Sequence, residues 1–192
     1  MEPTIDTTQT SLGSTSSNQF KLPLVSTGKY DFLIDWGDGY KSRVNQYNQT
    51  EITHTYLSSG SKTISITGMC NGFCFNNTGD RLKLTTITQW GTHFRLGRNE
   101  GGYFYGCSNL TTVPTSGLIL TGTTSLFSCF RGCSNFNSNI SSWNTSQVTD
   151  ISYMFINATA FNNGGASGTS SIPLSWDTSQ VINTGTQVNS RV

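Results

Sequence analysis

The sequence predicts a mainly β chain in which a small β-sandwich is followed by a short solenoid. Residues 104–110 recur almost unchanged at residues 130–136, and residues 155–161 form a third, degraded copy. The spacing from residue 104 to residue 130 is typical of a solenoid, in which each coil buries its apolar face only against the next coil. The first half has instead short alternating apolar segments with turn residues between them, a pattern typical of a sandwich.

The composition indicates a folded chain with an uncharged polar surface. Charged residues make up 11% of the 192 residues, aromatic residues make up another 11%, and there are 20 glycines. Disordered chains are usually poor in aromatic residues, so the abundance of Ser, Thr, Asn and Gly indicates short strands and tight turns. The formal net charge of +1 offers no basic surface for nucleic acid. No apolar run is long enough to span a membrane.

Residues 1–19 are predicted to form an extended arm that is either mobile or laid on a partner. They are polar, and the first apolar alternation occurs at residues 20–24, where we expect the first strand. The N-terminus has neither the basic region nor the apolar stretch of a secretory signal. We therefore expect a chain that is not exported by the general secretory route.

The sandwich is predicted over residues 20–80. Residues 30–36 alternate and end in Gly37-Asp38-Gly39, which indicates a strand followed by a tight turn. Residues 44–47 and residues 52–56 are shorter candidate strands. Residues 62–68 are predicted as one strand, which would place Ile64 and Ile66 on the same face of a sheet.

The solenoid is predicted over residues 81–192. Each coil is expected to contain a short strand, such as residues 84–88, and then a helical or 3₁₀ turn. An aromatic ladder is expected from coil to coil, formed by Phe104, Phe130 and Phe155. Asn109 and Asn135 are expected to form a second ladder, in which side-chain amides cap backbone groups. Residues 184–189 are expected to add a terminal strand or to lie against a neighbouring subunit.

The chain has five cysteines, which are Cys70, Cys74, Cys107, Cys129 and Cys133. An odd number leaves at least one thiol unpaired in a monomer. Cys107 and Cys133 occupy equivalent repeat positions and are expected to stack in neighbouring coils. We interpret the cysteines as small apolar core residues, and a disulfide remains an open alternative. The Cys-x3-Cys spacings differ from the Cys-x2-Cys of zinc sites, so no metal is predicted.

The first half resembles the PKD-type immunoglobulin-like module. The residues that carry the resemblance are Asp-Trp-Gly-Asp-Gly at 35–39, His-Thr-Tyr at 54–56 and the strand at 62–68, which follow one another in the order of that family. The resemblance implies an Ig/PKD-like β-sandwich over residues 20–80. Such modules are spacers on cell or particle surfaces.

The second half resembles the BspA-type leucine-rich repeats of bacterial surface proteins. Its Phe-x-Gly-Cys-Ser-Asn turns are similar to that family, as are the Trp-(Asn/Asp)-Thr-Ser-Gln-Val segments at residues 143–148 and 176–181. The resemblance implies a leucine-rich-repeat-type solenoid over residues 81–192. Family members tend to be longer, secreted and anchored, whereas this chain is expected to be short and to lack export and an anchor.

Few residues suggest catalysis or metal binding. His54 lies in the His-Thr-Tyr segment, where the resemblance implies a structural role, and His93 lies in a predicted loop with no evident acid partner. Asp31, Asp35 and Asp38 are close enough in sequence to suggest calcium, although their spacing is not that of an EF-hand. The favoured alternative is that Asp38 forms the turn and Asp35 accepts hydrogen bonds from nearby backbone amides.

The sequence thus predicts a non-enzymatic structural protein without a cofactor. We expect a virion component, such as a bacteriophage capsid decoration or fibre on the virion surface, because modules similar to both halves occur on phage surfaces and such a protein needs no export signal. The expected partners are other virion or surface proteins, reached through the arm of residues 1–19, and further copies in a homo-oligomer. Neither nucleic acid nor membrane insertion is expected.

Two alternatives remain open. The chain could be a bacterial cell-surface adhesin module that binds host protein or glycan, as BspA-like proteins are thought to do. It could also be a carbohydrate-binding accessory module with exposed aromatic side chains as a sugar platform. The candidates for that platform are Tyr40, Tyr47, Trp90 and Tyr103, and their competing interpretation is core packing.

Overall fold

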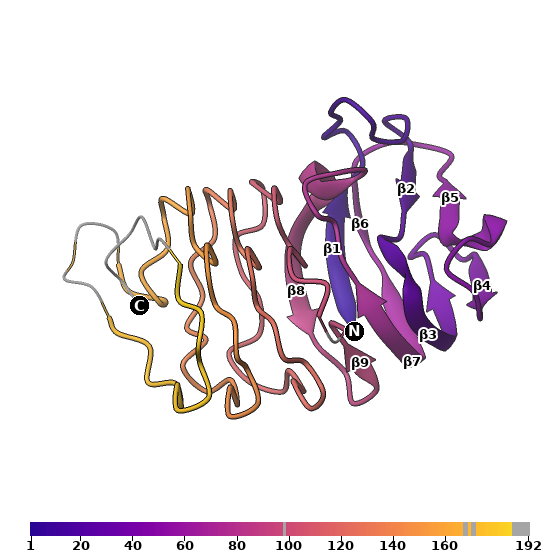
Figure 1. Cartoon of the computed structure of the whole chain (residues 1–192). Helices are drawn as coiled ribbons and strands as arrows, with labels where there is room; N and C mark the ends of the chain where they lie inside the picture. The colour runs from indigo at the N-terminus through magenta and orange to yellow at the C-terminus, as the bar shows by residue number, and fades with distance from the viewer. Residues whose placement is uncertain (98, 167–168, 170–171, 186–192) are drawn as a thin grey trace.

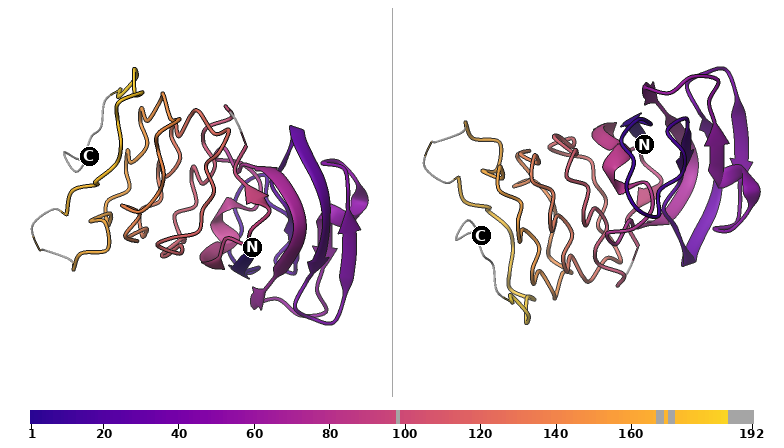
Figure 2. Two further views of the ribbon diagram at one scale, coloured as in Figure 1. Left: turned by 90° about the horizontal axis from the view of Figure 1, so that it is seen from below. Right: turned by 90° about the horizontal axis from the view of Figure 1, so that it is seen from above.

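The structure is a computed structural model that describes residues 1–97, 99–166, 169 and 172–185. The described chain is mainly β, with short 3₁₀ helices and no α-helix. Figure 1 shows the sheets at one end and a series of stacked coils at the other, and Figure 2 shows the same arrangement from two further sides. None of the helices in the described part of the chain has the length and apolar character needed to cross a bilayer.

Nine strands lie in the first half of the chain. They are β1 (Glu2–Asp6), β2 (Gln19–Lys21), β3 (Leu24–Asp35), β4 (Lys41–Val44), β5 (Thr53–Thr55), β6 (Ser61–Thr63), β7 (Ser65–Phe73), β8 (Leu84–Gln89) and β9 (Phe94–Arg95). Two 3₁₀ helices accompany them, η1 (Thr50–Ile52) and η2 (Arg81–Lys83). The strands form sheets of order β6-β1-β8, β2-β5 and β4-β3-β7-β9. All of these pairs are antiparallel except β7 with β9.

Strand β3 lies inside the largest sheet, between β4 and β7, and its residues alternate between the core and solvent. Tyr30, Phe32 and Ile34 are buried, whereas Asp31 and Leu33 are exposed. The predicted strand at residues 30–36 is therefore confirmed, and it extends further toward the N-terminus than expected.

The prediction of one strand over residues 62–68 is wrong. Ile64 and Ile66 are both buried, as expected, but the chain breaks between β6 and β7. Strand β6 pairs with β1, and β7 pairs with β3. The two parts of this segment belong to different sheets, so they cannot form one continuous strand. The period-two pattern of apolar residues does not reveal the break.

The expected extended arm of residues 1–19 is also corrected. Strand β1 lies in the middle of its sheet, between β6 and β8, with Pro3 and Ile5 buried. Figure 1 shows the N-terminus among the sheets. The first strand is therefore β1 and not residues 20–24. Its apolar alternation spans only two residues, which is too short for a reliable pattern.

The second half is built of coils joined by backbone hydrogen bonds. The amide of Phe104 donates to the carbonyl of Cys129 (2.9 Å), and the amide of Phe130 donates to the carbonyl of Met154 (2.9 Å). The Phe104 and Phe130 ring centroids are 5.4 Å apart, and the Phe130 and Phe155 centroids are 5.9 Å apart, with nearly parallel planes. The predicted aromatic ladder is confirmed.

Two further predictions for the coils are wrong. Asn109 donates to the carbonyl of Leu82 (2.8 Å) as a cap, but Asn135 is exposed, so the two do not form a ladder. The side-chain amide that links coils is instead Asn137, whose Oδ1 accepts from the Asn162 amide (2.8 Å). The expected helical turns are ordinary turns in the described residues.

The boundary expected at residue 81 does not separate two cores. Strands β8 and β9 follow that residue but belong to the sheets of the first half. Ring contacts then lead into the coils, since Phe104 lies 6.5 Å from Phe73 and 6.1 Å from Trp90 between centroids. The buried apolar residues form one continuous core. Residues 186–189 of the expected terminal strand lie outside the described residues.

Candidate functional site

The three carboxylates considered for calcium do not converge, because each contacts a different side chain. Asp31 pairs with Arg43 (2.7 Å) and Asp35 with Lys41 (3.0 Å), between neighbouring strands β3 and β4. Asp38 contacts His54 instead (2.8 Å). No group of three metal-binding side chains occurs within the part of the chain that the structure describes.

The turn after β3 explains two of these carboxylates. Asp35 accepts from the Gly37 amide (3.0 Å), and Asp38 accepts from the Tyr40 amide (3.2 Å). The turn-forming interpretation of both residues is confirmed. The Gly37 amide and the Lys41 ammonium together hold the pKa of Asp35 below its ordinary value.

His54 is packed in an aromatic cluster. Its ring stacks on Trp36 (centroids 4.9 Å apart) and meets Tyr56 edge-on (4.6 Å). Burial raises the pKa of Asp38, but hydrogen bonds from His54 and from the Tyr40 amide outweigh this effect and leave that pKa below its ordinary value. The pair links the turn after β3 to strand β5, which is a structural use of both side chains.

His93 lies apart from that cluster. Its Nδ1 lies 2.9 Å from the hydroxyl of the neighbouring Thr92. A hydroxyl of an adjacent residue is not the acid that a catalytic histidine needs. The two histidines therefore occupy separate and unrelated settings.

All five cysteines are free thiols, so the alternative of a disulfide is not realised. Cys107 and Cys133 are buried, and the Cys133 thiol donates to the Phe104 carbonyl of the preceding coil (3.0 Å). Burial raises the pKa of Cys70 to about 12 and that of Cys74 to about 11. Because the thiolate is the reactive form, these thiols are poor nucleophiles and act as core residues.

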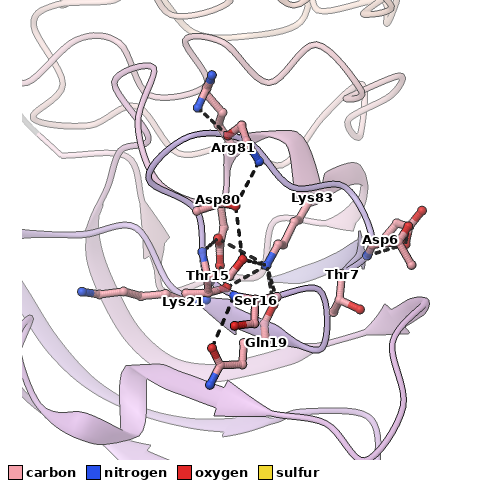
Figure 3. Close-up of polar contacts among 12 residues, drawn as sticks. Asp6, Thr7, Thr15, Ser16, Gln19, Lys21, Asp80, Arg81 and Lys83 are labelled. Carbon is pink, nitrogen blue, oxygen red and sulfur yellow. Dashed lines mark hydrogen bonds and ion pairs between the residues drawn. The ribbon is translucent and has the colours of Figure 1, made fainter.

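A buried ion pair fixes the loop between β1 and β2 (Figure 3). The Lys83 ammonium lies 3.4 Å from the Asp80 carboxylate, and neither side chain has exposed area. Lys83 also donates to the carbonyls of Thr15 (3.1 Å), Ser16 (2.8 Å) and Gln19 (2.7 Å). Asp80 accepts from both the amide and the hydroxyl of Thr15 (2.7 Å each).

This cluster is structural and not catalytic. Burial lowers the pKa of Lys83, and the Asp80 carboxylate opposes that change. The ammonium is enclosed by acceptors, so it is not available as a nucleophile or a base. Sequence reasoning missed the cluster because the bonded residues of the loop lie more than 60 positions from Lys83.

Only two of the four candidate sugar-platform residues reach solvent. Trp90 and Tyr103 are buried, with exposures of 2% and 0%. The core-packing interpretation is therefore correct for both. Tyr40 is 64% exposed and Tyr47 is 41% exposed. Tyr40 packs against His54, whereas Tyr47 borders two cavities of about 430 and 400 Å³.

In comparisons with known proteins, the coils are the part of the chain that matches a family model. Residues 102–190 match the family model described as "Mycoplasma protein of unknown function, DUF285". This segment begins at Gly102, whose amide already bonds to the next coil at Phe127 (2.6 Å). Neither the curated proteins nor the solved structures compared with the chain gave a match.

Proposed function

We propose that this chain is a non-enzymatic structural and attachment protein of a biological surface. The observation that carries the proposal is the continuous core that runs from the sheets through the Phe104, Phe130 and Phe155 rings. A core without interruption makes the two halves one stiff unit. The outer residues of the coils are mostly uncharged and polar, which suits a structural surface better than a catalytic site.

The proposal includes a finer assignment of the two halves. The first is a PKD-type immunoglobulin-like sandwich, and the second is a short solenoid of the BspA leucine-rich-repeat type. The stacking of Trp143 on Trp176 (6.3 Å between centroids, 9° between planes) supports the second assignment, since both begin the repeated Trp-(Asn/Asp)-Thr-Ser-Gln-Val segments. The family match over residues 102–190 supports it as well.

The proposed location is the surface of a virus particle. Free and buried thiols support it, because chains that fold in a reducing cytoplasm keep their cysteines unpaired. A bacterial cell surface is the second candidate. The similarity of the coils to the Mycoplasma family favours that candidate, since the repeats also resemble those of bacterial surface proteins.

Mass spectrometry distinguishes the two locations. Particles purified from the source are analysed in parallel with peptides that protease releases from intact cells. Peptides of this chain in the particles would support the virion, and peptides shaved from cells would support the cell surface. Finding the chain only in the soluble interior of cells would refute the attachment role.

A further inference from the structure

Two adjoining cavities flank the loop of residues 45–50 and share Tyr47 and Asn48 as a common wall. The larger one, of about 430 Å³, lies between this loop and the part of β3 around Lys29. The other, of about 400 Å³, lies between the loop and Lys21 of β2. Both have the size of ligand cavities, roughly 300–1,000 Å³. Together they can hold a ligand that passes over Tyr47.

An irregularity in β3 shapes the wall of the larger cavity. The pairing of β3 with β7 shifts between Leu24 and Lys29, and Gly28 lines the cavity at this place. The Tyr30 hydroxyl accepts from the Val25 amide (2.9 Å) and lies 2.8 Å from the Val25 carbonyl. A Cβ atom on Gly28 would lie 1.9 Å from that hydroxyl and 2.6 Å from the backbone carbonyl oxygen of Asn71, so only glycine fits. Irregularities of this kind often occur beside binding sites.

The loop between the cavities is held in shape while its side chains remain available. Gln49 Oε1 accepts from the amides of Asn45 (2.8 Å) and Gln46 (2.9 Å). Asn45, Gln46 and Asn48 are exposed, and Tyr47 is 41% exposed. An aromatic ring offers a flat apolar face to the C–H groups of a sugar, and amides both donate to and accept from sugar hydroxyls. These residues have the chemistry of a saccharide site.

The charges around the cavities select the kind of saccharide. Lys29 lines the larger cavity and Lys21 lines the smaller one, and the lining of neither includes Asp or Glu. Neither lysine forms a salt bridge within the described residues. Beside the smaller cavity the Glu51 carboxylate is already bound by the lining residues Gln49 (3.1 Å) and Thr50 (3.2 Å). Each cavity therefore offers a lysine without a salt-bridge partner, which favours a ligand with carboxylates of its own.

We propose that the two cavities on either side of Tyr47 bind an acidic oligosaccharide, with one sugar ring against each side of the loop and its carboxylates near Lys29 and Lys21. The inference rests on the proposed attachment role and names the class of molecule to which the protein attaches.

Calorimetric titration of the full chain tests this site. The probes are a hyaluronan hexasaccharide and 3′-sialyllactose, with neutral chitotetraose for comparison. We expect an acidic probe to bind at least tenfold more tightly than chitotetraose, with an affinity that falls as salt is added. Tyr47→Ala should weaken binding at least tenfold, and the double variant Lys21→Gln/Lys29→Gln should remove the preference for acidic probes.

Tyr40→Ala is the matched control, because Tyr40 is an exposed tyrosine that lines neither cavity. It should bind like the unaltered chain, and the Tyr47 and lysine variants should keep their melting temperature, so that weaker binding does not reflect unfolding. Absence of binding to every probe, equal affinity for acidic and neutral probes, or equal losses in Tyr40→Ala and Tyr47→Ala would each overturn the proposal. Such a failure leaves the location experiment unaffected, so the attachment role is judged separately.

Discussion

A left-handed backbone conformation recurs two residues after each phenylalanine of the aromatic ladder. Gly106, Gly132 and Asn157 occupy the equivalent position with φ angles of +82°, +71° and +60°. Glycine adopts this conformation without strain, and asparagine is the most tolerant of the other residues. The repeat of glycine at this position follows directly from the repeated turn.

Alanine substitutions at Gly132 and Gly106 should distinguish the cost of backbone strain from the cost of a steric clash. In Gly132→Ala the nearest atom to the new Cβ is 3.7 Å away, so only the left-handed conformation is costly, by about 1–2 kcal/mol. In Gly106→Ala the Cβ would lie 2.2 Å from Asn77 Oδ1 and 2.7 Å from Arg81 Cδ. Urea unfolding should therefore show the larger loss for Gly106→Ala. Equal losses would contradict the packing of these turns.

Part of the free energy of unfolding should depend on pH through the Asp38 carboxyl. Its pKa in the folded chain is below the ordinary value of about 3.9, so its stabilisation is complete above that pH and is lost as the pH falls toward the folded value. We expect Asp38→Asn to be less stable than the unaltered chain at pH 7 and to lose less stability on acidification. Thermal melting between about pH 6 and pH 2.5 measures this. Parallel melting curves against pH would refute it.

The loop between β1 and β2 is held in place by a short 3₁₀ helix, not by regular pairing. Helix η2 supplies Lys83, and Arg81 adds a hydrogen bond to the hydroxyl of Ser11 (2.9 Å). The loop thus depends on a few charged groups buried where water cannot replace them. Such an arrangement is sensitive to the removal of one partner.

Lys83→Met should destabilise the chain by about 3–5 kcal/mol, since the Asp80 carboxylate and the loop carbonyls would lose their buried partner. Urea unfolding measures the loss. Lys41→Met is the control, because the Lys41–Asp35 pair is largely exposed, and exposed pairs contribute about 0–1 kcal/mol. Similar small losses for both variants would contradict the buried pair.

The sequence predicts the elements of this fold unevenly. The Phe104 and Phe130 stack is predictable, because identical residues one repeat apart must overlie each other. A strand at residues 84–88 is predicted as the short strand of a coil, and β8 confirms the strand although it pairs with β1 in the sheets. Strand β1 and the Lys83 cluster are not predictable, since both depend on contacts with distant segments. The Tyr47 cavities were missed for the same reason, as Lys21 and Lys29 meet residues 45–50 only in the folded chain.

Phe130 is the ring on which the continuity of the core depends most. It is fully buried and contacts Phe104, Phe136 and Phe155 at centroid distances of 5.4, 4.0 and 5.9 Å. Phe130→Ala should lower the free energy of unfolding by roughly 3–5 kcal/mol. Phe127→Ala, at a ring that is 38% exposed, should cost far less. Losses of the same size would show that the stacked rings are not the core.

The joining of sheets and coils into one unit has a direct test in native-state hydrogen exchange of the full chain. The Phe104 and Phe130 amides bond from coil to coil, and the amides of β3 and β7 bond within the largest sheet. We predict that both sets give the same free energy of opening, equal to that of global unfolding. Fast exchange of Phe104 and Phe130 while β3 and β7 stay protected would show that the coils open independently and would contradict the single stiff unit.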